Sequence, residues 1–222
     1  MTATKKLETI VDKYFTQSYS FYKKLDAKGE NININFEFNS RADFLKIYLD
    51  YYRDQENLQD TIIGACTARF KIEYRGQQYE LKHTHQEEFE DAQNNLRGVN
   101  NSILTTMASK LLLRTSHLES AVSFDDIFKI IKSTKVTGFG ELSIYDTAVR
   151  ISSFRGYQPT VVFLHAGTKD GVRNLERQGF ISKDSSLKDT LRTDEFPPSI
   201  QKLNALQMEN FLCAFKHELK NI

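Results

Sequence analysis

Two glycines separated by one apolar residue, Gly138-Phe139-Gly140, carry the sharpest chemical signal in the sequence. They lie between two segments of helical periodicity, 124–132 and 142–154. Glycine lets a backbone turn tightly and approach a phosphate closely, because it has no Cβ. The amides of both glycines and of the next helical turn could then point outward and bind an anion. The alternative is a tight corner between two helices that binds no ligand.

A second candidate anion site follows the apolar run 161–163. Thr168 is expected to cap the next helix, whose first amides could bind a phosphate together with Lys169. His165 emerges from the buried run into a turn, where it could act as a general base or proton donor. Its alternative role is to hold the turn by a hydrogen bond to the backbone. The candidate DNA- or phosphate-binding residues are Lys135, Thr137, Gly138, Gly140, Ser143, Thr168 and Lys169.

Two histidines one residue apart, His83 and His85, end the segment that precedes an acidic run. On a strand both would point the same way and could ligate a metal, with Glu87 or Glu88 completing the shell. The sequence shows no third ligand at a matching spacing, so a solvated loop is the simpler interpretation. We therefore expect no metal site and no cofactor.

The stretch GFGELSIYDTAVRI, followed by PTVVFLHAGTKDG, resembles a group of uncharacterised bacterial helix-hairpin-helix proteins. The resemblance covers residues 83–215 and is strongest over 138–171. It implies a hairpin between two helices, although Thr137 stands where the family often has a proline. It brings no enzymatic activity with it. A hairpin of this kind would hold the DNA backbone without reading the base sequence.

A more distant similarity is to the helix-hairpin-helix DNA glycosylases, which carry an aspartate in a stretch similar to residues 145–150. In those enzymes the aspartate lies beyond the second hairpin helix. Asp146 is instead expected inside that helix, where it can pair with Arg150 four residues later. An enzyme of glycosylase or nuclease type would use Asp146 and His165 as its catalytic residues.

The composition limits how the chain could bind a charged partner. It has 222 residues, with 30 Lys and Arg against 29 Asp and Glu, so the formal net charge is +1. Bulk charge therefore cannot drive binding to nucleic acid, and any such binding must be local. The chain has only two cysteines, Cys66 and Cys213. We therefore expect neither a disulfide scaffold nor a cysteine-based zinc site. The sequence shows neither a membrane-spanning run nor a signal peptide, and we expect a cytoplasmic protein that does not bind membranes.

The hydrophobic periodicity predicts a mainly α (α+β) protein. We expect an N-terminal α+β module over residues 1–90, with one strand and one β-hairpin, and a helical module over 91–222 that contains the helix-hairpin-helix. The expected front elements are a helix over 4–27, a strand over 32–38, a helix or broken pair from Ser40 to Ala68, and a hairpin over 69–82. The expected further helices are 87–96, 102–114, 124–132, 142–154, 168–178 and 205–220.

Three functions fit these features. The first is sequence-independent DNA binding at the hairpin, in DNA repair or genome defence. The second is an enzyme acting on DNA, and the third is a protein-interaction module whose hairpin is purely structural. In the third case the tyrosine-rich helix near residues 44–52 would bind the partner. The sequence does not determine the oligomeric state.

Overall fold

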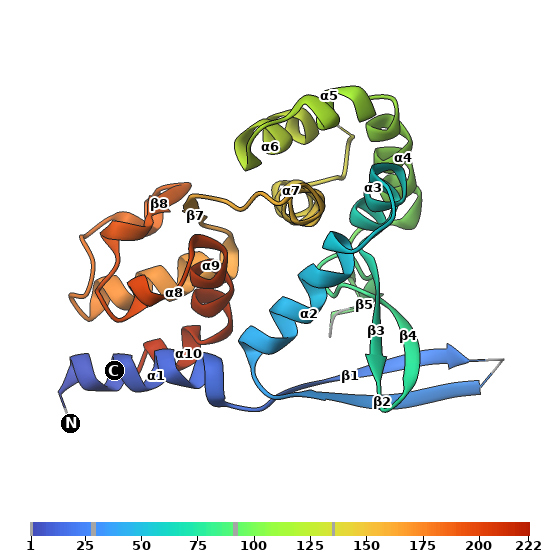
Figure 1. The fold of residues 1–222 in the computed structure, drawn as a ribbon. Coiled ribbons are helices and arrows are strands. Elements are labelled where there is room, and N and C mark those ends of the chain that lie inside the picture. Colours follow the sequence, from blue (N-terminus) through green and yellow to red (C-terminus); the bar gives the residue numbers. More distant parts are fainter. Residues whose placement is uncertain (1, 28–29, 91–92, 135) are drawn as a thin grey trace. The chain divides into compact units, whose positions relative to one another are not determined.

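The structure, a computed structural model, describes residues 2–27, 30–90, 93–134 and 136–222 (Figure 1). Helices dominate the described chain, and its strands pair into two-stranded antiparallel sheets, which confirms the mainly α, α+β class. The chain forms two compact units, one of residues 1–46 with 159–222 and one of residues 47–158. The predicted boundary at 90 and 91 falls inside the second unit. The division into folding domains at 1–90 and 91–222 stays a prediction.

The first unit joins both ends of the chain in one hydrophobic core. Leu7, Val11 and Tyr14 from the first helix pack in the same buried cluster as Phe211 and Leu212. The elements of this unit are α1 (Ala3–Thr16), β1 (Tyr19–Ala27), β2 (Glu30–Phe38), β7 (Val161–Phe163), α8 (Ala166–Arg177), β8 (Thr190–Arg192), α9 (Ala205–Ala214), α10 (Lys216–Leu219) and 3-10 turns at Ser185–Leu187, Thr193–Glu195 and Ile200–Lys202.

The predicted helix over residues 4–27 is wrong in its second half. The helix ends at Thr16, and β1 pairs with β2 as a long antiparallel hairpin (Figure 1). The cause is a period of two that the helical interpretation overlooked: Tyr19 and Phe21 lie on one face and stack against Phe38. The front of the chain therefore contains two hairpins, where the sequence predicted a single strand and one hairpin.

The second unit is built mostly from helices. The helix expected between Ser40 and Ala68 is a broken pair, α2 and α3, and the Ser40 hydroxyl accepts a hydrogen bond from the Asp43 amide at 3.0 Å. The predicted hairpin over 69–82 is confirmed, and its turn residues Arg75 and Gly76 both have positive φ, as in a type I′ turn. The elements are α2 (Arg41–Arg53, shared with the first unit), α3 (Leu58–Thr67), β3 (Arg69–Tyr74), β4 (Gln77–Lys82), β5 (Phe89–Glu90), β6 (Leu96–Arg97), α4 (Asn101–Leu112), α5 (Thr115–Ser120), α6 (Phe124–Thr134) and α7 (Glu141–Arg155).

The predicted helix over residues 87–96 is wrong. The short strands β5 and β6 pair there, with Phe89 opposite Arg97, and residues 91–92 lie outside the described chain. Phe89 and Leu96 are 54% and 67% exposed, so these two apolar side chains do not supply a buried face that could stabilise a helix. The three-residue strands β7 and β8 were also not predicted, because their pairing joins residues far apart in the sequence.

Of the helices in the described chain, none combines the length and the apolar character that crossing a bilayer requires.

Two glycines inside helices offer a matched test of packing. A Cβ on Gly171 in α8 would lie 2.4 Å from the carbonyl oxygen of Leu212, whereas one on Gly64 in α3 would meet its nearest atom at 3.5 Å. Gly171→Ala should therefore destabilise the protein by about 1–3 kcal/mol through overpacking. Gly64→Ala should be neutral or stabilising by up to about 1 kcal/mol, because alanine favours helix. Thermal unfolding of both variants tests this, and an unchanged midpoint for Gly171→Ala would contradict the close packing of α8 on α9.

Candidate functional site

Helix α7 is the central helix of the second unit, with α3 and α6 packed against it. Its side chains are buried on nearly every face from Ser143 to Ser152. Small residues such as Thr147 and Ala148, both fully buried, let the neighbouring helices approach closely. The helix ends at Gly156, which adopts the left-handed conformation with φ 74° and donates its amide hydrogen to Ser152 and Ser153.

Arg150 is the largest fully buried side chain in this helix. Its Nε donates to the Tyr48 hydroxyl, one terminal nitrogen donates to the Ala65 carbonyl at 2.8 Å, and the other donates to Oε1 of Gln86 at 2.9 Å. The second terminal nitrogen also lies 3.7 Å from Oδ2 of Asp146, the ion pair expected from their spacing. The guanidinium therefore joins α2, α3, α7 and the loop after β4.

The Ala65 carbonyl is a favourable acceptor because it lies in the last turn of α3. Carbonyls there lack a partner within the helix and carry the negative end of the helix dipole. Burial alone would lower the pKa of Arg150, but the surrounding oxygens of Tyr48 and Asp146 outweigh burial and raise the pKa. The arginine is therefore a permanent positive charge in the core.

Asp146 is the acidic centre of this network, and its side chain is 13% exposed. Its Oδ2 lies 2.8 Å from Nδ1 of His85 and accepts a hydrogen bond from Nε2 of Gln86 at 3.0 Å. Burial alone would raise the pKa of Asp146, but the hydrogen bond to His85 and the charge of Arg150 outweigh it. The net pKa lies well below the usual range for aspartate. Asp146 is therefore ionised at neutral pH.

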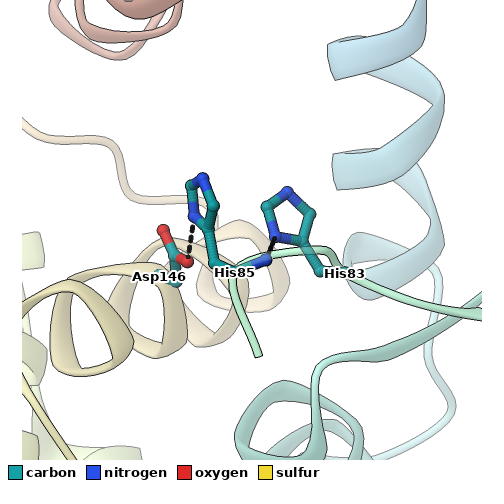
Figure 2. A group of neighbouring side chains, drawn as sticks. All are labelled: His83, His85 and Asp146. Atoms are coloured by element: carbon teal, nitrogen blue, oxygen red, sulfur yellow. Dashed lines mark hydrogen bonds and ion pairs between the residues drawn. The ribbon is translucent and has the colours of Figure 1, made fainter. Parts of the chain in front are cut away.

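The two histidines predicted as possible ligands lie beside this carboxylate (Figure 2). His85 is between Asp146 and His83, and the two imidazole rings are 4.5 Å apart, edge to face. One ring nitrogen of each histidine and a carboxylate oxygen of Asp146 all lie within 4.8 Å of one another. Asp146 was not predicted as the third partner, because it lies 61 residues beyond His85 and no local spacing links them.

The glycine pair lies in the turn between α6 and α7. Gly138 has φ +86°, and a Cβ there would lie 2.6 Å from Cδ1 of Ile103, so both its conformation and its packing require glycine. Phe139 is 5% exposed, whereas Thr137, Gly138 and Gly140 are exposed. Lys135 lies outside the described residues, and Ser143 is buried.

Several backbone amides of this turn donate no hydrogen bond within the described chain. Within the described chain, the amides of Gly138, Gly140 and residues 141–143 form no hydrogen bond, and Gly140 caps α7 without a side-chain acceptor. Two basic side chains lie near the end of α6: Lys132 pairs with Glu141 at 3.2 Å, and Arg114 donates to Ser133 at 2.7 Å.

The residues of the second candidate anion site belong to the other unit. His165, not Thr168, is the N-cap of α8, so the predicted cap is wrong. Thr168 is fully buried inside the helix and donates its hydroxyl to Glu209 at 3.0 Å, which explains why the side chain turns away from the helix end. Lys169 lies 3.9 Å from Asp189, and the His165 ring stacks on Phe163.

Comparisons of this chain with protein-family models, with curated proteins and with solved structures found no match. The function must therefore be inferred from the geometry and chemistry of the residues described above.

Removing the buried guanidinium should be costly. Arg150→Met leaves Asp146 without its cation and leaves the Ala65 carbonyl with only the long 3.5 Å hydrogen bond from the Thr147 hydroxyl, so we expect a loss of about 3–5 kcal/mol in the free energy of unfolding. Arg69→Met, in which an exposed pair with Glu80 is lost, should cost about 0–1 kcal/mol. Urea denaturation measures both, and similar losses for the two variants would contradict the central role of Arg150.

The depressed pKa of Asp146 predicts a pH dependence. Because the pKa is lower in the folded chain than the usual value of about 3.9, ionised Asp146 stabilises the fold above about pH 4. This contribution is lost as the pH falls through the folded-state pKa. The stability difference between the wild type and Asp146→Asn should therefore be present at pH 7 and shrink steadily below pH 4. Chemical denaturation across this range checks it, and a difference independent of pH would exclude an ionised, stabilising Asp146.

Proposed function

We propose that the protein binds DNA through a helix-hairpin-helix formed by α6, residues 136–140 and α7, which holds backbone phosphates whatever the base sequence. The observation that carries this proposal is the set of amides at Gly138, Gly140 and the first turn of α7. They lie at an exposed turn, and no hydrogen bond in the described chain occupies them.

Several amides at one helix N-terminus suit a phosphate better than any neutral ligand. The N–H groups are donors, and the helix dipole adds positive potential at the same place. Phe139 anchors the turn in the core, so the donors are held in place before a ligand arrives. A preorganised site loses less conformational entropy on binding.

Basic side chains at the end of α6 support a local contact with the DNA backbone, and Glu141 in the first turn of α7 is the acidic partner of Lys132. Lys132 and Arg114 can reach phosphates next to the one that the amides hold, because the C-terminal end of α6 leads directly into the turn. With a net charge of only +1, the overall charge of the chain adds little to DNA binding. Binding should therefore be weak at high salt and insensitive to the base sequence.

DNA repair or genome defence is the setting that this proposal favours, by analogy with helix-hairpin-helix proteins. The enzymatic alternative assigns catalysis to Asp146 and His165, which belong to different units. The remaining alternative, a protein-interaction module with a structural hairpin, predicts no DNA binding at all.

The test is a duplex-binding titration with Gly140→Asp. Gly140 has φ −76°, and a Cβ there would meet no atom within 4 Å, so the variant should fold normally. The new carboxylate at the N-cap would accept hydrogen bonds from the first-turn amides and repel a phosphate. We expect at least a tenfold loss of affinity for a fluorescent duplex at low salt.

Val122→Asp is the matched control, because it adds the same charge at an exposed position before the other end of α6. That end is about 16 Å away along an 11-residue helix. The affinity of Val122→Asp for the duplex should stay within about twofold of that of the wild type. If both variants bind alike, or if the wild type shows no salt-dependent binding, the proposed function is wrong.

A further inference from the structure

We propose that His83, His85 and Asp146 form a binding site for a divalent transition-metal ion. All three lie in the second unit: the histidines follow β4, and Asp146 projects from α7 (Figure 2). The proposal rests on this geometry and does not depend on DNA binding by the hairpin.

The spacing of the ligand atoms is close to what a metal ion needs. With bonds of about 2.1 Å to imidazole nitrogen and carboxylate oxygen, neighbouring ligand atoms are about 3.0–3.4 Å apart around an octahedral or tetrahedral ion. The distance from Nδ1 of His85 to Oδ2 of Asp146 is 2.8 Å, and the whole set spans no more than 4.8 Å. Small side-chain rotations would therefore complete the site.

The chemistry of the set also fits a cation. Asp146 is ionised, and its second carboxylate oxygen, Oδ1, accepts no hydrogen bond from the described residues. Gln86 and Arg150 contact Oδ2, the same oxygen that faces His85, and so limit the freedom of the carboxylate before an ion binds. Such outer contacts orient metal ligands and strengthen binding.

The ligand types indicate which ions bind. Two imidazoles favour zinc, iron and cobalt over magnesium and calcium, which prefer oxygen ligands. Three protein ligands leave at least one coordination position for water or for an oxygen of a bound molecule. His85 is 38% exposed, so solvent reaches that position. The site therefore has the form of a reactive centre and differs from a closed structural zinc site.

The position of the site gives it a connection to the hairpin. Asp146 follows Gly140 by six residues in α7, a rise of about 9 Å along the helix. Both features therefore belong to the same helix, but the six-residue spacing also places Asp146 about 120° around the helix axis from Gly140.

Metal titration of the chelator-treated protein, without a histidine tag, tests the site. We expect one Co²⁺ per chain with visible d–d absorption, and displacement by Zn²⁺ but not by a hundredfold excess of Mg²⁺. His83→Ala and His85→Ala should each weaken binding at least tenfold, and Asp146→Asn should do the same. Circular dichroism establishes that each variant is folded.

His117→Ala is the matched control, because His117 is an exposed histidine of the same unit in α5. Its metal affinity should equal that of the wild type. If Asp146→Asn does not fold, His85→Ala is the decisive variant, because His85 is exposed. The proposal is overturned if the wild type shows no saturable binding of one ion. The proposal is also overturned if His85→Ala binds Co²⁺ as tightly as His117→Ala does. Loss of DNA binding in Gly140→Asp bears only on the hairpin, so the two proposals can fail separately.

Discussion

The fold of the second unit depends on one buried guanidinium. An arginine cannot lose its proton at any pH a protein meets, so every N–H of Arg150 needs an acceptor in the core. Those acceptors come from α2, the end of α3, the loop after β4 and α7 itself. A shift of α7 by one residue would break the contacts to α2, α3 and the loop after β4 together. The buried charge therefore fixes the register of the helix against three neighbours.

The same network places the candidate metal ligands. Gln86 accepts a hydrogen bond from Arg150 and donates one to Asp146, so its amide ties the loop after β4 to α7. Because His85 precedes Gln86 in the chain, these hydrogen bonds of Gln86 also bring the His85 imidazole against the Asp146 carboxylate. The exposed turn at Gly140 begins the same helix. Both candidate sites thus depend on a helix that is held by its largest buried polar side chain.

Local patterns in the sequence predicted much of this structure. The β-hairpin over 69–82, the cap at Ser40 and the helices on either side of Gly138 follow from turn chemistry and periodicity within a few residues. The helix over 4–27 failed because its second half also fits a period of two, and only pairing with β2 decides between them. The meeting of His85 with Asp146 could not be predicted, since it depends on how α7 packs against distant elements. Arg150 gave a weak signal of this packing, as a charge within the apolar and small-residue stretch Thr147–Ser152 of α7.

The interleaving of the two units along the chain has a consequence for synthesis. Residues 47–158 leave the ribosome as one uninterrupted stretch, whereas the first unit needs α8, α9 and α10 to cover the apolar face of α1. The second unit can therefore complete its core while the first still waits for its C-terminal half. During that interval Leu7, Val11 and Tyr14 remain uncovered in the nascent chain. Helix α1 is thus synthesised before the segments that bury its apolar stripe.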